Sequence, residues 1–263
     1  MLIEQLFIGN SLRNFNYLIA CPKTGDALLI DPFDAKRCLA RAAELNLNIT
    51  QVINTHEHWD HVGGNAEIVA ATQATIMAHF QAIDSIPHAT RGLHAGDIIK
   101  VGSTINIEVL DTPGHTMAHV CLLAHSGDEK ALFSGDTLFN AGCGNCYNGG
   151  DVHAMFHTVA GQLARLPDDT KLYPGHEYLQ NNLRFSLFHE PTNQRAQNLL
   201  DSITWDETNP FVSTLGLEKE ISPFFRLANP EIVHRLTADY PELSATPSSE
   251  DVFVRLRQLR DKW

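Results

Sequence analysis

The stretch Thr55-His56-Glu57-His58-Trp59-Asp60-His61-Val62-Gly63-Gly64 decides how this chain of 263 residues is interpreted. It follows the strand-like run Gln51-Val52-Ile53-Asn54, and its candidate ligands His56, His58, Asp60 and His61 offer three imidazoles and one carboxylate within six residues. Neutral imidazoles and carboxylates are suitable ligands for borderline divalent metals in hydrolases. Because the chain has 14 histidines, an isolated His-x-His is equally well explained as a polar loop. The density of the full cluster favours metal binding.

Three further candidate ligands follow strand-like runs later in the chain. They are His115 in Thr112-Pro113-Gly114-His115-Thr116, Asp136 in Ser134-Gly135-Asp136-Thr137-Leu138, and His176 in Tyr173-Pro174-Gly175-His176-Glu177-Tyr178. A glycine immediately precedes each of them, and glycine permits the backbone turn that aims a side chain back over a sheet edge. A single Gly-His or Gly-Asp is usually an ordinary turn, but three of them in this order predict one composite site.

The predicted site has enough ligands for two metal ions. Its members are His56, His58, Asp60, His61, His115, Asp136 and His176. Two metals about 3.5–4 Å apart lower the pKa of bound water toward neutrality and so supply a hydroxide nucleophile. Asp60, beside that nucleophile, either accepts its proton or acts as a ligand only. Histidine and aspartate serve zinc, iron and manganese alike, and zinc is the first expectation.

The pattern of the whole chain predicts an α/β fold followed by a helical region. Strand candidates are residues 15–19, 27–31, 51–54, 75–77, 98–101, 105–110, 119–124, 131–133 and 171–173, and helix candidates are 35–45, 66–71 and 152–166. After Tyr178 the strand signals stop. Helical spacing continues in 183–188, 196–203 and 252–259, with loops and one short helix near 230–236 between them. We expect one domain over residues 1–177 and a second over 178–263.

Composition narrows the class of partner and the compartment. The formal net charge of −12 opposes long-range attraction to nucleic acid or an anionic membrane surface. No apolar run approaches the roughly 18 residues of a membrane span, and the first residues do not form a signal peptide. The five cysteines are odd in number and irregularly spaced, which favours a reducing compartment over a disulfide framework. We expect a cytoplasmic protein with a small-molecule substrate, and the oligomeric state stays open.

In these motifs the chain resembles the metallo-β-lactamase superfamily and, within it, the glyoxalase II (hydroxyacylglutathione hydrolase) family, nearly from end to end. The family-specific segments are 137–144, 175–178 with 181–185, 222–226, and 252–253 with 256–261. The resemblance implies an αββα sandwich with a C-terminal helical, substrate-binding domain. It also implies one metal on His56, His58 and His115, a second on Asp60, His61 and His176, and Asp136 as a catalytic carboxylate that bridges both.

The resemblance further implies a glutathione thioester as substrate, such as S-lactoylglutathione, hydrolysed to glutathione and a 2-hydroxy acid. The residues at the family's glutathione-binding positions are Asn145, Tyr147, Tyr178, Arg257 and Arg260. Arg257 and Arg260 lie three apart, hence on one helix face, and would form a positive patch for an anionic tripeptide. Asn145 departs from the family's usual Lys or Arg, and losing such a charge-assisted contact costs on the order of 1–2 kcal/mol of binding.

Three other functions fit parts of the pattern. A sulfur dioxygenase of the same superfamily uses one iron and also acts on glutathione derivatives, but it lacks part of the second ligand set. Asp136 and the C-terminal arginines disfavour a lactonase or β-lactamase. The complete ligand set disfavours a non-catalytic binding module.

Other residues near the predicted site have two interpretations each. Cys143 and Cys146 form a C-x-x-C, which is a redox or metal motif in some proteins but stands alone here, in a loop that the resemblance assigns to substrate. His119 and Asp31 either orient ligand imidazoles or are ordinary strand residues.

Overall fold

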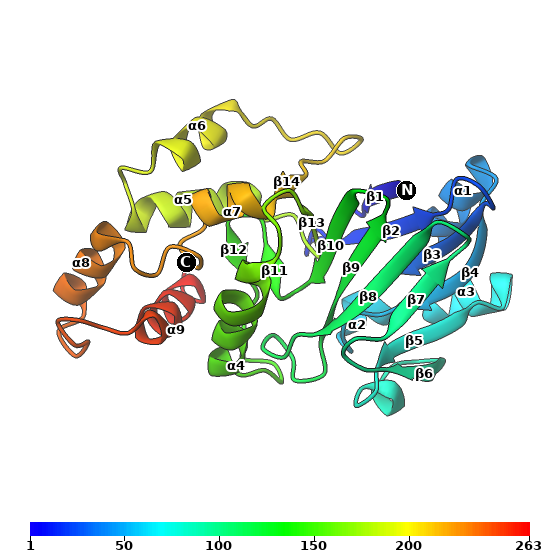
Figure 1. Ribbon diagram of the computed structural model, residues 1–263, viewed down its shortest axis with the longest axis horizontal. Helices are drawn as coiled ribbons and strands as arrows, with labels where there is room; N and C mark the ends of the chain where they lie inside the picture. Colours follow the sequence, from blue (N-terminus) through cyan, green and yellow to red (C-terminus); the bar gives the residue numbers. More distant parts are fainter.

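The structure, a computed structural model, describes all residues from Met1 to Trp263 and contains two mixed six-stranded sheets (Figure 1). The strands of the first sheet follow chain order: β1 (Leu2–Phe7), β2 (Phe15–Ala20), β3 (Asp26–Ile30), β4 (Asn48–Ile53), β5 (Thr75–His79) and β6 (Ala89–Leu93). β1, β2 and β3 are antiparallel, and β3 to β6 run parallel. The crossovers between the parallel strands carry α1 (Ala35–Glu44), the short α2 (Trp59–Val62), α3 (Asn65–Thr72) and the 3-10 turn η1 (Ile83–Ser85).

The second sheet includes a short strand from the C-terminal part of the chain. Its order is β14 (Ser213–Thr214), β13 (Lys171–Pro174), β10 (Glu129–Gly135), β9 (Val120–Ser126), β8 (Ile105–Asp111) and β7 (Ile98–Val101). Only the β10–β13 pair is parallel. A two-stranded hairpin, β11 (Leu138–Phe139) and β12 (Gly142–Cys143), leaves the end of β10.

Strand β2 explains why the sheets pack in layers. Successive side chains of a strand point to opposite faces. Phe15, Tyr17 and Ile19 enter the core between the sheets, while Leu18 and Ala20 pack with the helices on the outer face. All six residues of β2 are buried, and its one side-chain amide, Asn16, donates to the Asp31 carbonyl (2.5 Å), so the strand does not alternate between buried and exposed residues. The layers are therefore helix, sheet, sheet and helix.

The remaining helices gather at the end of the molecule opposite α1 and α3 (Figure 1). They are α4 (Val152–Phe156), continued by a π-helix η2 (His157–Gln162) and a 3-10 turn η3 (Leu163–Arg165), then α5 (Leu179–His189), α6 (Gln194–Ser202), α7 (Leu215–Ile221), α8 (Pro230–Asp239) and α9 (Ser249–Arg260). Phe253 of α9 packs with Leu132 of β10 and Met155 of α4 in one core on the outer face of the second sheet. None of the helices has the length and apolarity that crossing a membrane requires.

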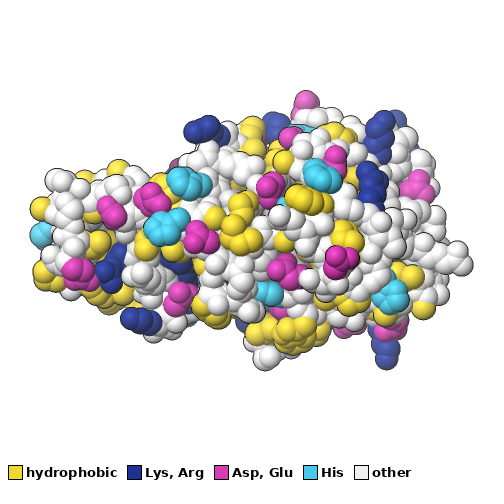
Figure 2. All heavy atoms as spheres, turned by 90° about the horizontal axis from the view of Figure 1, so that it is seen from below, with side chains coloured by type: hydrophobic (Ala, Val, Ile, Leu, Met, Phe, Trp, Pro, Cys, Tyr) yellow, Lys and Arg dark blue, Asp and Glu magenta, His cyan; other side chains and the backbone are white.

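The surface is chemically mixed on the face seen in Figure 2. Acidic, basic and apolar side chains are interspersed there, and no single kind covers the face.

The predicted αββα sandwich with a helical C-terminal region is confirmed, with local corrections. The helix expected over 152–166 is wrong as one α-helix: it changes to π- and 3-10 turns at His157, within a segment that contains Gly161. The loop region 204–250 holds two helices, α7 and α8, rather than the single helix expected. The sequence does not reveal α7 because this helix is short and its polar Glu218-Lys219-Glu220 run conceals the apolar period. Strand signals do not stop at Tyr178, since β14 joins β13. The division at 177/178 stays a prediction.

Glu218 of α7 ties the helical region to the hairpin after β10. Its carboxyl is fully buried and accepts hydrogen bonds from Asn140 Nδ2 (3.1 Å), the Ala141 amide (2.6 Å) and Ser213 Oγ (2.5 Å). No cation lies against it among the ion pairs of the structure. Burial raises the pKa of Glu218 to about 7, although these three donors pull the pKa back down.

Glu218 should make stability depend on pH. Because its pKa in the folded chain lies above the ordinary 4.5, its contribution is fully present below pH 4.5 and is lost as the pH rises through about 7. In Glu218→Gln, which has no charge to bury, the free energy of unfolding relative to wild type should improve by about 2–3 kcal/mol between pH 5 and pH 8. Urea unfolding of both proteins across that range measures this. A difference that does not vary with pH would contradict it.

Candidate metal centre

The seven predicted ligands come from segments that follow four different strands and meet at one place. His56 and His58 follow β4, Asp60 and His61 lie in α2, and His115 lies between β8 and β9. Asp136 follows β10 and His176 follows β13. Three overlapping groups have ligand atoms within 4.8 Å of one another: His56-His58-His115, His56-His61-Asp136 and Asp60-His61-His176. All but the half-buried His58 are buried.

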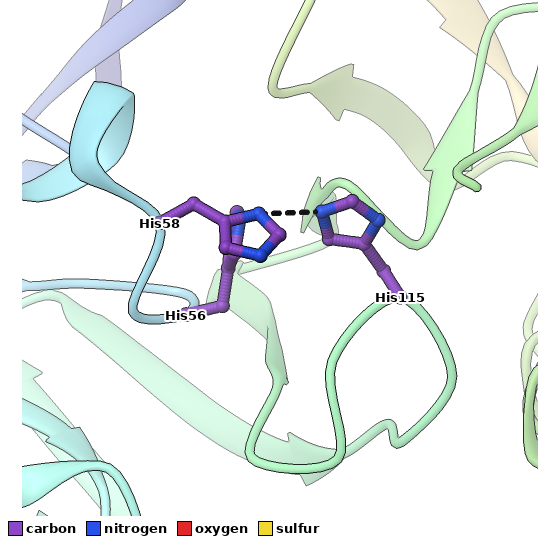
Figure 3. A group of neighbouring side chains, drawn as sticks. All are labelled: His56, His58 and His115. Carbon is purple, nitrogen blue, oxygen red and sulfur yellow. Dashed lines mark hydrogen bonds between the residues drawn. The ribbon is translucent and has the colours of Figure 1, made fainter. Parts of the chain in front are cut away.

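In the first group two imidazole rings face each other from separate loops (Figure 3). His58 Nδ1 lies 3.0 Å from His115 Nε2. The outer nitrogens meet backbone acceptors: His115 Nδ1 lies 2.7 Å from the Asn145 carbonyl and His58 Nε2 lies 3.1 Å from the Asn148 carbonyl. A carbonyl only accepts, so the outer nitrogen of His115 carries the proton and its inner nitrogen presents a lone pair. His58 Nε2 also lies 3.2 Å from Asn148 Nδ2, and its inner nitrogen presents a lone pair in the tautomer that donates to the Asn148 carbonyl. Two facing lone pairs repel unless a cation lies between them.

The group of Asp60, His61 and His176 repeats this arrangement. His61 Nδ1 lies 2.9 Å from an Asp31 carboxylate oxygen, and His176 Nδ1 lies 2.7 Å from the Leu12 carbonyl. Their Nε2 atoms therefore face each other with lone pairs at 3.3 Å. Asp60 Oδ2 lies 3.5 Å from both Nε2 atoms, which adds negative charge to the same point.

Asp136 lies between the two groups. Its Oδ2 is 3.5 Å from His115 Nε2 and 3.1 Å from His176 Nε2, and its Oδ1 is 3.5 Å from His61 Nε2. Oδ1 is buried without a hydrogen-bond donor, as is His56 Nε2. An unpartnered buried carboxylate oxygen and an unpartnered buried imidazole nitrogen are costly unless a cation binds them. The donor set and its unpaired atoms thus fit a pair of divalent metals.

The pKa values of the site follow from burial and from the carboxylates. Burial lowers the pKa of His56 and of His115, although Asp136 opposes it, so both rings are held neutral, as ligation requires. Burial also disfavours charge on His61, but Asp136 and Asp31 outweigh it and raise the pKa. The negative potential that holds a proton on His61 would hold a metal cation in its place.

Two of the glycines before the ligands are required for different reasons. Gly135 has φ +47° before Asp136, a left-handed conformation that strains other residues. Gly175 has no positive φ. A Cβ there would collide with Asp136 Oδ1, so close approach to the cluster excludes a side chain.

Partners outside the ligand set orient the imidazoles. Asp31 accepts from the Thr55 amide (2.7 Å), from Thr55 Oγ1 (2.7 Å) and from His61, so it orients a candidate ligand. His119 Nε2 accepts from the Asp136 amide (3.2 Å) and is not in the ligand groups. The sequence did not point to Asn14, whose Nδ2 lies 3.0 Å from Asp60 Oδ2.

The predicted substrate residues line two adjoining pockets beside the cluster. One pocket of about 300 Å³ is formed partly by the ligands and includes Trp59, Asn145, Tyr147 and Tyr178. A second of about 210 Å³ shares the last three and extends to the arginines and Asp261 of the C-terminal end. The Tyr147 side chain is 78% exposed, and the Tyr178 hydroxyl donates to the Leu12 carbonyl (3.0 Å).

The two arginines differ in what they already bind. Arg257 is 4% exposed and donates to the Cys143 carbonyl (2.6 Å) and to Asp261 Oδ1 (2.8 Å). Arg260 is half-buried, donates from Nε to Asn182 Oδ1 (3.1 Å) and forms no ion pair. Both terminal nitrogens of Arg257 are thus paired and its Nε is buried without a partner, whereas both terminal nitrogens of Arg260 are free beside the second pocket.

Cys143 and Cys146 are free thiols. Burial raises the pKa of Cys143 to about 11 and that of Cys146 to about 12, so both stay protonated at neutral pH. A protonated thiol is a poor nucleophile and a poor metal ligand, which disfavours a redox or metal role for this pair.

This fold with its histidine and aspartate cluster defines a metallo-β-lactamase-type protein: residues 12–176 match the metallo-β-lactamase superfamily, to which the chain belongs. Residues 177–263 match the region described as the hydroxyacylglutathione hydrolase C-terminus. The chain is 54% identical over 264 residues to a hydroxyacylglutathione hydrolase of Polaromonas sp. strain JS666, covering all of both chains. It is a member of the hydroxyacylglutathione hydrolase family.

More distant relatives share the length and the fold. A protein of Arabidopsis thaliana named hydroxyacylglutathione hydrolase cytoplasmic is 36% identical over 258 residues, or 95% of each chain. The solved structure of ETHE1 from Myxococcus xanthus superposes with a TM-score of 0.67 at 28% identity and covers 98% of this chain and 99% of its own. That of TTHA1623 in a di-iron-bound form has a TM-score of 0.58 at 26% identity, over 84% and 99% of the two chains.

Asp31→Asn should weaken metal binding without disturbing the fold. Asn tolerates the positive φ of +49° at this position. Since the Thr55 amide needs an acceptor, the new NH2 would face His61 Nδ1 and reverse its tautomer, which removes the inner lone pair. Metal affinity should fall roughly 10- to 100-fold in chelator competition. Asp34→Asn, at the N-cap of α1, is the control, and equal affinities in all three proteins would contradict the role of Asp31.

Proposed function

We propose that the chain is a binuclear metal-dependent thioester hydrolase that converts S-2-hydroxyacylglutathione, such as S-lactoylglutathione, to glutathione and a 2-hydroxy acid. One observation carries this proposal. The inward-facing imidazole nitrogens and the carboxylates open onto a pocket that is continuous, through Asn145, Tyr147 and Tyr178, with a pocket containing a free arginine. The residues that would hold the metals are thus adjacent to those that would bind an anionic carrier.

His56, His58 and His115 would hold one metal, Asp60, His61 and His176 the other, and Asp136 both. The overlap of the ligand groups and the position of Asp136 between them support this assignment. We propose zinc, with iron or manganese as alternatives, since imidazole and carboxylate suit all three. When bound, the metals supply a Lewis acid and a water of lowered pKa, which makes a nucleophile available near neutral pH.

The chain's own residues bind and orient the substrate. Arg260, with Tyr147 and Tyr178, would bind the glutathione part in the second pocket, which directs the thioester toward the cluster. Asp60 is available either to accept a proton from the attacking water or only to hold a metal. The leaving thiolate needs no strong general acid.

Arg257 would act on the substrate through the loop rather than directly. Its two terminal nitrogens are occupied by the Cys143 carbonyl and Asp261, so it holds the end of β12, where the proposed substrate loop begins. We propose that residues 1–177 form the catalytic domain and 178–263 the substrate-binding domain. We further propose a cytoplasmic location, supported by the five free thiols and by the cytoplasmic name of the Arabidopsis relative.

The deciding experiment measures thiol release from S-lactoylglutathione by metal-replete protein. Hydrolysis should be lost after chelation and return with two equivalents of metal per chain. A lactoyl thioester of a small thiol without carboxylates is the control and should react with a much higher KM. If the protein instead holds one iron per chain and consumes oxygen with a glutathione persulfide, the dioxygenase alternative replaces this proposal.

The two arginines should give different kinetic defects. Arg260→Ala removes a charge-assisted contact with the carrier and should raise KM about tenfold or more, with little change in kcat. Arg257→Ala leaves the buried Cys143 carbonyl without its donor, so it should lower the melting temperature as well as kcat. Steady-state kinetics and thermal melts of both variants measure this. A pure KM effect in Arg257→Ala would reverse the two roles.

Asn145 offers a test by gain of function. Its side-chain oxygen is buried without a partner, and it lines both pockets. Asn145→Lys adds a cation near the carrier and should lower KM for S-lactoylglutathione about tenfold, the magnitude of one charge-assisted contact. Asn145→Met, of similar length but uncharged, is the matched control. An equal KM in both variants would show that position 145 does not contact the carrier.

A further inference from the structure

A turn between β1 and β2 packs against the ligand group of Asp60, His61 and His176. It runs from Asn10 to Asn14, and Asn14 forms an isolated β-bridge with His176. Two more backbone bonds join it to the segment around that histidine: the Phe15 amide donates to Gly175 (2.8 Å) and the Glu177 amide donates to Arg13 (3.0 Å). Although more than 160 residues separate these segments, they are locked together.

Asn14 reaches from this turn to Asp60. Its side chain is fully buried, and Nδ2 donates to Asp60 Oδ2 (3.0 Å) and to the Asp60 carbonyl (3.1 Å). Its Oδ1 accepts from Asn10 Nδ2 (2.7 Å), and its backbone amide donates to Asn10 Oδ1 (3.0 Å). Because Asn10 occupies the acceptor end, the donor end of the Asn14 amide must point at Asp60. One residue thus holds both the carboxylate and the backbone of the same candidate ligand.

The same turn orients a second member of the group. The Leu12 carbonyl accepts from His176 Nδ1 (2.7 Å), which fixes the tautomer that presents Nε2 to the cluster. The first group has other outer partners, namely the carbonyls of Asn145 and Asn148 and the hydroxyl of Thr55. The turn therefore acts on Asp60 and His176 and makes no hydrogen bond to His56, His58 or His115.

We propose that Asn14 is a positioning residue of the metal centre, which holds the Asp60 carboxylate and, through its turn, His176 in the geometry that binds the second metal. The proposal rests on the proposed two-metal function. Without the amide, Asp60 loses its outer hydrogen bond and its carboxylate is free to rotate away from the cluster. Occupancy at Asp60, His61 and His176 should fall, while occupancy at His56, His58 and His115 should not.

The test compares Asn14→Ala with wild type by metal content and by the rate of metal release to a chromogenic chelator. In the variant one of the two metals should leave roughly 10- to 100-fold faster, the usual effect of losing an outer partner of a ligand, and the other at the wild-type rate. The kcat for S-lactoylglutathione should fall while KM stays within about twofold. Asn10→Ala frees the Asn14 amide to turn without removing it, and should shift the same metal in the same direction by less.

Asn193→Ala is the matched control, since Asn193 is also a buried asparagine but caps α6 and contacts Glu190 and the Glu220 carbonyl. It should lower the melting temperature and leave both release rates unchanged. The role of Asn14 would be overturned if both metals left Asn14→Ala at the wild-type rates, or if both left it equally faster. It would also be overturned if Asn193→Ala showed the same change as Asn14→Ala. If Asn14→Ala does not fold, Asn10→Ala decides. Wild type that binds fewer than two metals would instead overturn the proposed function.

Discussion

The repulsion between inward-facing imidazole lone pairs is the constraint on which the site depends. His58 and His115 face each other at 3.0 Å, and His61 and His176 at 3.3 Å. Neither pair is stable at these separations unless a proton or a metal cation lies between the nitrogens. The chain keeps the rings in place by giving each outer N–H an acceptor that does not move with the ligand. Cation binding is therefore built into the backbone and the buried carboxylates as well as into the ligands.

The sandwich supplies these acceptors because loops from both sheets end at one edge. The Leu12 carbonyl precedes β2 in the first sheet, whereas Asn145 and Asn148 follow the hairpin that leaves the second. The apolar core between the sheets holds the strands in place. The positions of the loops are therefore set by the packing of the strands rather than by contacts with metal. Glu218 of the helical region likewise fixes the hairpin after β10, because its carboxyl accepts from the Ala141 amide. The same hairpin presents the Cys143 carbonyl to Arg257.

The sequence indicates the candidate ligands that the structure brings together but not the groups that support them, for a physical reason. The cluster from His56 to His61 is local, and each distant candidate is marked by a preceding glycine. The supports are mostly backbone carbonyls, which any residue has, so Leu12 carries no signal for its role. The pairing of Asn14 with Asp60 crosses 46 residues and depends on which loops meet at the sheet edge. Helical spacing places Arg257 and Arg260 on one face, but only the packing of α9 shows that the terminal nitrogens of Arg257 are paired and those of Arg260 are free.

The segment from Asn145 to Asn148 contacts both the candidate metal ligands and the pocket proposed for the substrate. Its carbonyls contact His115 and His58, while Asn145 and Tyr147 line the pocket that we propose for the carrier. A carbonyl contact does not depend on the identity of the side chain, so residue 145 can change from a cation to Asn without loss of the imidazole orientation. Under the proposed function, loss of the family's usual basic residue at this position would therefore cost carrier affinity alone. Under the same proposal, selection for the thiol carrier would act through the side chains of this segment, while its backbone keeps the candidate ligands oriented.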